Sequence, residues 1–137
     1  MKTHTANYKN TFIAVADDCP VPGGEVPPVK GDTKTVANLQ YDLIRNNPYR
    51  FTSDDVLFHV FSKRNDLTDA ELEQAREQFF SKGQPCLRAC PLTKKYGWGI
   101  HSNEEGKVAM FGSETAEYQN FVKDKSLVVL KAMRSAK

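Results

Sequence analysis

The hydrophobic pattern changes its period near Pro91, and this change constrains the fold more than any other feature of the chain. Between residues 36 and 83, apolar side chains recur every three or four positions, as on one face of a helix. From Tyr96 onward they alternate in two short runs, 96–101 and 107–111, around the turn Asn103-Glu104-Glu105-Gly106. Gly106 supplies the positive φ that such a turn needs. The sequence therefore predicts helices followed by a β-hairpin.

The helical part of the chain predicts three helices. The first two each place four apolar residues on one face. These faces consist of Val36, Leu39, Leu43 and Ile44 in the first helix, and of Val56, Leu57, Val60 and Phe61 in the second. Pro48 ends the first helix because the residue before a proline avoids the helical conformation. Thr52 or Ser53 begins the second as an N-cap. Thr68 and Glu71 form a capping box at the start of the third.

The remaining segments complete the predicted order of elements. Gly83 is the expected left-handed stop of the third helix. A short strand is expected at 10–16, a helix from Ser113 to about Val122, and a last strand at 126–134. The segment 19–32 contains four prolines and three glycines, which predicts an irregular loop that packs across the core edge or covers something.

This order predicts an α+β fold in one globular domain, residues 1–137. The expected sheet is small and largely antiparallel, with an N-terminal strand, the central hairpin and a C-terminal strand, and about four helices pack on it. A four-residue hairpin loop would pair Ser102 with Lys107 and Trp98 with Phe111. One hairpin face would then be bulky, whereas the other would carry little side-chain bulk. The sparse face would comprise Gly97, Gly99, His101, Val108, Met110 and Gly112. A one-residue bulge would change these faces.

Composition and charge narrow the classes of function. The net charge is only +2, so the chain lacks the dense basic surface of a dedicated nucleic-acid-binding protein. Its longest strongly apolar run, Leu127-Val128-Val129-Leu130, is too short to cross a membrane. The first residues lack the apolar stretch of a signal peptide, which predicts a cytoplasmic location. The three cysteines are then expected to be reduced thiols. A homodimer is compatible with the sequence.

Residues 86–101 are the expected place of a functional site. They concentrate two cysteines, the only tryptophan, several basic side chains and a histidine. The leading hypothesis is a non-catalytic domain that binds a small anion, since basic groups and exposed backbone N–H groups recognise carboxylates and phosphates. The candidate binding residues are Arg88, Lys94, Lys95, Gly97, Gly99 and His101. No phosphate-binding glycine loop accompanies them.

Two further hypotheses remain open. The first is a small enzyme in which His101 activates the thiol of Cys86 or Cys90, although no signature of a cysteine hydrolase is present. The second is an interaction module that pairs with a partner through the edge of its hairpin. Cys86, Cys90, His101 and Cys19 could also be considered as zinc ligands. Their spacing lacks the paired Cys-x-x-Cys of structural sites, so we expect no metal and no cofactor.

The stretch from Pro91 to His101, with Leu92-Thr93-Lys94-Lys95-Tyr96-Gly97-Trp98-Gly99-Ile100 between them, carries a resemblance that extends beyond single motifs. Together with the opening Met1-Lys2-Thr3-His4-Thr5 and the segment Thr52-Ser53-Asp54-Asp55-Val56-Leu57-Phe58, it resembles a family of small uncharacterised bacterial proteins. That family is classed as a domain of unknown function. The resemblance implies a bacterial-type cytoplasmic protein and implies no activity, cofactor or catalytic residue.

Overall fold

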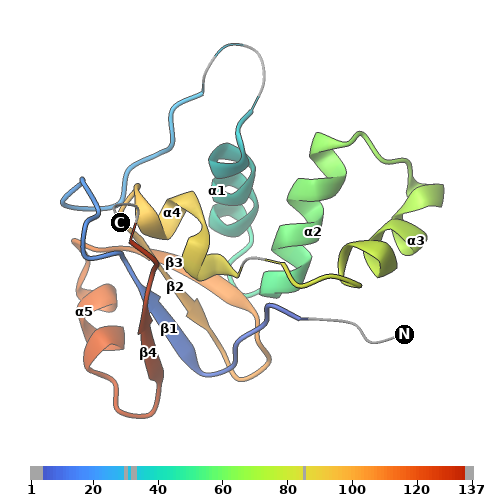
Figure 1. The fold of residues 1–137 in the computed structure, drawn as a ribbon. Coiled ribbons are helices and arrows are strands. Elements are labelled where there is room, and N and C mark those ends of the chain that lie inside the picture. The colour runs from blue at the N-terminus through green and yellow to red at the C-terminus, as the bar shows by residue number, and fades with distance from the viewer. Residues whose placement is uncertain (1–4, 30, 32–33, 85, 135–137) are drawn as a thin grey trace.

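The fold is built around a four-stranded mixed sheet with helices on both faces (Figure 1). The structure is a computed structural model that describes residues 5–29, 31, 34–84 and 86–134. The strands are β1 (Thr11–Ala14), β2 (Trp98–Ser102), β3 (Val108–Gly112) and β4 (Val128–Lys131), in the order β3-β2-β1-β4. The predicted α+β class is confirmed. The C-terminal strand differs from an antiparallel arrangement, because β4 runs parallel to β1.

The register of the hairpin differs by one residue from the prediction. Ser102 pairs with Val108 and Trp98 pairs with Gly112, so five residues, 103–107, form the connection. The Gly106 N–H donates to the carbonyl of Asn103, and Gly106 has a φ of +81°. This left-handed residue after a tight turn adds the extra position of a bulged hairpin. The predicted faces of β3 are therefore exchanged.

The exchanged register sorts the side chains into two cores. On one face, β2 and β3 contribute apolar side chains to a large core against α1 (Val36–Asn46), α2 (Ser53–Arg64) and the short α4 (Pro91–Lys94). The strand residues of this core include Ile13, Trp98, Ile100, Val108 and Met110. On the other face, Phe12 and Ala14 pack with Tyr118 of α5 (Ala116–Lys123).

Gly99 lies under α5, which explains the close approach that its small size permits. A Cβ atom at Gly99 would lie 2.4 Å from the Phe12 ring and 2.6 Å from the Tyr118 ring. The sequence left open whether a helix, a partner or a ligand approaches this strand. At Gly99 the approaching groups are the Phe12 ring of the neighbouring strand β1 and the Tyr118 ring of α5.

The capping residues account for where the helices begin. Thr35, Thr52 and Thr68 are the N-caps of α1, α2 and α3 (Asp69–Phe79), and each belongs to a capping box. Two predicted helix boundaries are wrong, and the strands predicted at 10–16 and 126–134 are shorter, at Thr11–Ala14 and Val128–Lys131. Helix α3 ends at Phe79, ahead of Gly83, and Thr115 takes the place of Ser113 as the N-cap of α5.

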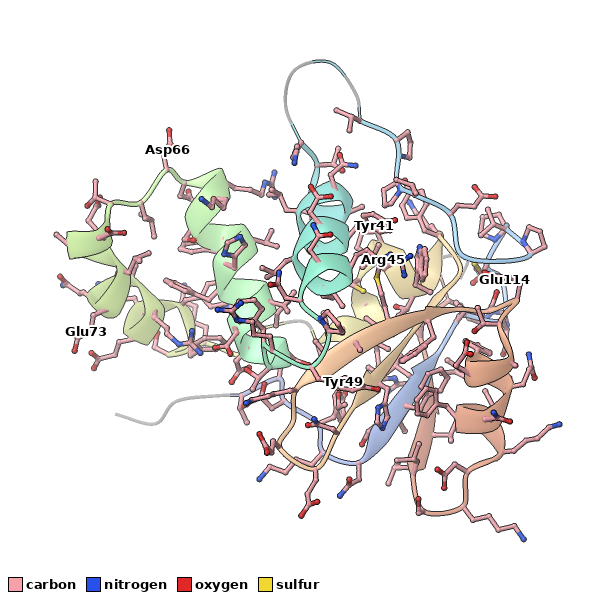
Figure 2. The ribbon with its side chains drawn as sticks, turned by 180° about the vertical axis from the view of Figure 1, so that it is seen from behind. Tyr41, Arg45, Tyr49, Asp66, Glu73 and Glu114 are labelled. Carbon is pink, nitrogen blue, oxygen red and sulfur yellow. The ribbon has the colours of Figure 1, made fainter. Side chains whose placement is uncertain are left out.

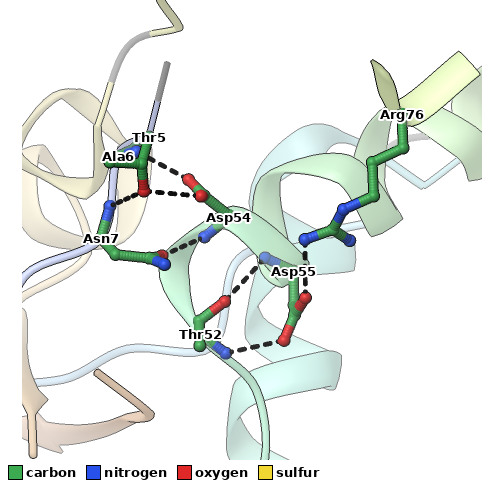
Figure 3. Close-up of polar contacts among 7 residues, drawn as sticks. All are labelled: Thr5, Ala6, Asn7, Thr52, Asp54, Asp55 and Arg76. Atoms are coloured by element: carbon green, nitrogen blue, oxygen red, sulfur yellow. Dashed lines mark hydrogen bonds and ion pairs between the residues drawn. The ribbon is translucent and has the colours of Figure 1, made fainter. Parts of the chain in front are cut away.

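The start of α2 also holds the N-terminal segment and α3 in place (Figure 3). Asp54 accepts hydrogen bonds from the Thr5 hydroxyl and the Ala6 N–H, both at 2.6 Å. Its neighbour Asp55 forms an ion pair with Arg76 of α3 at 3.0 Å. Side chains at the first turn of one helix thereby connect three segments that are distant in the sequence.

The described part of the loop 19–32 packs across the edge of the core, which is one of the two alternatives that the sequence left open. The Trp98 Nε1–H donates to the carbonyl of Glu25 at 2.8 Å, and the Glu25 N–H donates to the carbonyl of Tyr96. The carbonyl oxygen of Gly23 would lie 2.2 Å from a Cβ atom at Gly97, where φ is +78°. The loop therefore needs glycine at position 97 for its own close packing.

Within the described residues, no helix has both the length and the apolar character needed to cross a membrane.

Candidate functional site

A small apolar pocket lies where α1, α2, the end of α3 and the short helix η1 (Leu87–Ala89) come together. Its volume is about 190 Å³. The lining residues are neutral, and most of them are apolar. They are Val36, Gln40, Leu57, Phe79, Gln84, Cys86, Ala89, Cys90 and Pro91.

Local sequence patterns place these side chains around one space. Val36 and Gln40 are four residues apart on α1 and therefore share one helix face. Pro91 is the first residue of α4, where its missing N–H has no effect on the helix, and it fixes the path of the chain from Cys90. The segment 86–101 thus contributes four residues to the pocket, namely Cys86, Ala89, Cys90 and Pro91.

Gln40 is the unusual member of the lining. Its exposed fraction is only 3 %, and its Oε1 has no hydrogen-bond partner in the described part of the chain. A buried polar atom without a partner costs about 1–3 kcal/mol. The hydroxyls of Ser53 and Ser102 also lack partners among the described residues, but neither residue lines this pocket. Gln40 therefore differs from both serines, because it lines the apolar pocket and also carries a buried acceptor without a partner among the described residues.

A wider groove adjoins the pocket and leads to the surface between α1 and α2. It has a volume of about 520 Å³ and shares Val36, Leu57, Phe79 and Gln84 with the pocket. Two half-buried residues of the predicted core face of α2, Leu57 and Phe61, line this groove. Arg64 and Asn65 form its polar end. The groove does not include Gln40, and it adjoins the pocket through the four shared residues.

The two cysteines of the pocket have different surroundings. The Tyr8 hydroxyl donates to the half-buried Cys86 Sγ at 3.1 Å. Burial of Tyr8, together with this hydrogen bond to Cys86, raises the pKa of Tyr8 to about 12. Cys90 is buried beside Thr93, with its Sγ 3.6 Å from the Thr93 hydroxyl, and burial raises the pKa of the Cys90 thiol. A buried thiol of raised pKa is a poor nucleophile at neutral pH.

His101 lies on the α5 face of the sheet, away from both of these thiols. Its Nδ1 is 2.8 Å from the Tyr49 hydroxyl, and its ring stacks on Phe121 with centroids 4.4 Å apart. Among the described residues, the structure thus shows no contact between His101 and either thiol that would support activation of a thiol by His101. Burial lowers the pKa of His101, and the nearby Asp124 opposes this effect. His101 therefore becomes protonated at a lower pH than a histidine with the ordinary pKa of 6.5.

The other candidate anion-binding residues lie in different parts of the fold. Arg88 Nε donates to the carbonyl of Lys131 at 2.8 Å, so this side chain covers the outer edge of β4. Lys94 and Lys95 lie at the end of α4, Gly97 lies under the loop, and Gly99 lies under α5. None of the six residues lines the pocket that contains Gln40. The anion site stays a prediction from the sequence.

The comparisons with known proteins place the chain in a family. The family model described as "Family of unknown function (DUF6157)" matches residues 3–137. The chain belongs to this family. Membership in DUF6157 agrees with the resemblance seen in the sequence and assigns no functional residue. The comparisons with curated proteins and with solved structures gave no match.

No group of three His, Cys, Asp or Glu side chains that could hold a metal ion occurs among the described residues of this DUF6157 member. Cys19, the fourth residue considered as a zinc ligand, points its thiol toward the carbonyl of Val21 at 3.9 Å. The thiols and the imidazole therefore have separate local partners.

Gln40 is the functional candidate that the sequence analysis missed. It lies four residues after Val36 and four before Ile44, both of which belong to the predicted apolar face of α1. A polar side chain in the middle of an apolar helix stripe must be buried with its amide. This position was the available signal in the sequence, since helix periodicity alone places Gln40 inside.

Proposed function

We propose that the protein binds a small, neutral, largely apolar molecule that carries one hydrogen-bond donor. The observation that carries this proposal is that Gln40 lines the apolar pocket and that its buried Oε1 has no partner among the described residues. A hydroxyl, amide or ring N–H of a ligand would donate to this oxygen and remove the cost of leaving it unpaired. We propose a neutral ligand and not the anion expected from the sequence, because none of the described residues that line the pocket is charged.

The volume of the pocket sets the size of the ligand. An apolar cavity of about 150 Å³ is large enough to hold benzene. The pocket, at about 190 Å³, has room for a single ring with a short substituent. A longer apolar substituent would extend into the adjoining groove past Leu57 and Phe61. The proposed ligand class is therefore a small ring compound with a hydroxyl or amide group.

The proposed setting is the cytoplasm. Cys19, Cys86 and Cys90 are free thiols, and free thiols are usual for proteins of reducing compartments. Two of these thiols line the pocket, where a reducing environment would preserve them for packing against a ligand.

The test compares two probes of nearly the same shape, phenol and toluene, by calorimetry on the wild-type protein and on Gln40→Met. Methionine keeps the length of the side chain and removes the amide. The ratio of the phenol affinity to the toluene affinity should be about tenfold larger in the wild-type protein than in Gln40→Met, since about 1.4 kcal/mol corresponds to a factor of ten. Comparing ratios removes the difference in hydration between the two probes.

Gln119→Met serves as the matched control, because Gln119 is an exposed glutamine of α5. It should leave both affinities unchanged. An affinity ratio that is the same in the wild-type protein and in Gln40→Met would refute a ligand contact at Gln40. Absence of binding by either probe, and by a panel of ring alcohols and ring amides, would refute the proposed function.

A further inference from the structure

A second groove lies along the free edge of β3, and it shares no lining residue with the Gln40 pocket. Its volume is about 700 Å³. Figure 2 looks onto this strand, with Arg45 at the end of α1 on one side and Glu114 near the start of α5. The edge of β3 forms the floor, and the ends of the two helices form the walls.

The edge of β3 already makes hydrogen bonds with another part of the chain, the turn at residues 48–51 and the bridge residue Thr52. The Tyr49 N–H donates to the carbonyl of Val108, and the Val108 N–H donates to the carbonyl of Phe51, each at 2.9 Å. Thr52 forms an antiparallel bridge with Lys107. These contacts show that Val108 directs its backbone groups away from β2, toward the outer side of the sheet.

The same direction repeats two residues further along, at Met110. Alternate residues of a strand direct their backbone groups to the same side. The N–H and C=O groups of Met110 therefore point into the groove, and no strand of the described residues pairs with β3 on that side. The edge ends at Gly112, whose carbonyl accepts the Thr115 N–H. The backbone groups of Met110 are thus the part of the edge that has no strand partner between the turn at residues 48–51 and α5.

The walls of this groove carry opposite charges. Arg45 has no ion-pair partner among the described residues, and its guanidinium lies 6.0 Å from the Trp98 ring centre. On the α5 side lie Glu117, which is exposed, and Glu114, whose Oε1 accepts the Gly24 N–H at 2.9 Å. An added strand would direct successive side chains alternately to the α1 wall and to the α5 wall.

We propose that the edge of β3 binds an extended peptide segment of a partner protein by strand addition. In the bound peptide, the residue that lies opposite Met110 is acidic and faces Arg45. The residue before it in the peptide is basic and faces Glu117. This order follows from antiparallel pairing, the direction in which residues 49–52 already lie on the edge. Backbone hydrogen bonds supply affinity in such complexes, and the alternating side chains supply specificity.

The test uses the peptide Ac-Thr-Val-Lys-Asp-Ala-Thr-amide and a charge-exchanged version with Asp-Lys at the centre. Binding is followed by the emission of Trp98, the only tryptophan, and by the amide NMR signals of Met110 and Gly112. The wild-type protein should bind the first peptide at least tenfold more tightly than the second. Arg45→Glu should weaken the first peptide by at least tenfold.

The variant Arg45→Glu/Glu117→Lys should reverse the preference, so that the charge-exchanged peptide binds better. Such a reversal cannot come from a loss of folding, and an unchanged melting temperature of Arg45→Glu provides the folding control. Equal binding of both peptides by the wild-type protein would overturn the charge assignment and the proposal. Absence of shifts at Met110 and Gly112 with millimolar peptide would overturn strand addition at this edge.

Discussion

The two thiols of the pocket differ in access, although both line the same space. Cys86 is half-buried and accepts the Tyr8 hydroxyl, whereas Cys90 is buried and its pKa is raised by that burial. Reaction with alkylating reagents requires an accessible thiolate. We therefore expect iodoacetamide to label Cys86 in the native protein and to label Cys90 only after unfolding, as measured by mass spectrometry.

A bound ligand should change this labelling at one position. Occupancy of the pocket should slow alkylation of Cys86 and leave that of Cys19 unchanged, because Cys19 is not part of the lining. Labelling of Cys90 at the same rate as Cys86 in the native protein would contradict the burial of Cys90.

His101 predicts a pH dependence of stability with a definite sign. Burial lowers its folded pKa below the reference value of 6.5, so the unfolded chain binds its proton more readily than the folded protein. The free energy of unfolding should therefore decrease as the pH falls from above 6.5 toward the lowered folded pKa. Urea denaturation between pH 5 and about pH 8 measures this effect.

Removal of the imidazole should reduce this dependence. His101→Gln retains a polar group for the Tyr49 hydroxyl and cannot titrate. His59, whose pKa is also lowered by burial, requires the parallel variant His59→Gln. An unchanged pH dependence in His101→Gln would show that His101 is not the group responsible.

At the scale of elements, the contact between β2 and α5 depends on the missing side chain of Gly99. A methyl group there would overlap the rings of Phe12 and Tyr118, at 2.4 and 2.6 Å. We expect Gly99→Ala to lower the free energy of unfolding by about 1–3 kcal/mol, as overpacking does in other cores. Chemical denaturation provides the measurement. A stability equal to that of the wild-type protein would show that α5 moves away from β2 without cost.

Helix α3 is held less firmly than the other helices that surround the pocket. It contains no buried residue, and it contacts α2 through Phe79, which packs on Phe58 and Phe61, and through the Arg76–Asp55 ion pair. We expect its amides to exchange hydrogen faster than those of α1, as measured by mass spectrometry. Binding at the pocket should slow this exchange, since Phe79 lines it. Equal protection of α1 and α3 would contradict this description.

Local chemistry made most elements predictable from the sequence. Capping boxes at Thr52 and Thr68 mark true helix starts, because cap hydrogen bonds form within four residues. The parallel pairing of β4 with β1 was not predictable, since it joins segments more than 100 residues apart. The predicted hairpin register is wrong by one residue, because the turn contains a bulge. The sequence fixes the place of Gly106 but does not reveal the extra residue of the bulge.

The candidate site was predictable only in part. Cys86, Ala89, Cys90 and Pro91 of the segment 86–101 line the pocket, whereas the six predicted binding residues do not, and the site predicted from the sequence stays a prediction. The partners of this segment come from α1, α2 and α3, and only tertiary packing brings them together. His101 does not join them because the sheet separates the α5 face, where His101 lies, from the face that carries α4. Lys94 lies on the α4 side, at the end of that short helix, but does not line the pocket.

At the scale of the whole molecule, Gln40 lowers the stability of the ligand-free protein relative to an apolar side chain at the same position. An apolar side chain of the same size would fill the space without an unpaired acceptor, as interiors normally do. The single-domain organisation, which stays a prediction, would make this cost visible as a change in one cooperative unfolding transition. The free energy of unfolding of the ligand-free protein therefore shows whether the Gln40 amide oxygen is hydrogen-bonded.

The decisive measurement is the free energy of unfolding of Gln40→Met, relative to the wild-type protein and to the exposed control Gln119→Met, in the absence of ligand. The account predicts that Gln40→Met raises this free energy by about 1 kcal/mol, because it removes a buried polar atom that has no partner. Gln119→Met should change it by less than about 0.5 kcal/mol. A loss of 1 kcal/mol or more in Gln40→Met, about the value of a typical hydrogen bond, would show that the amide is already bonded in the native protein and would contradict the central claim.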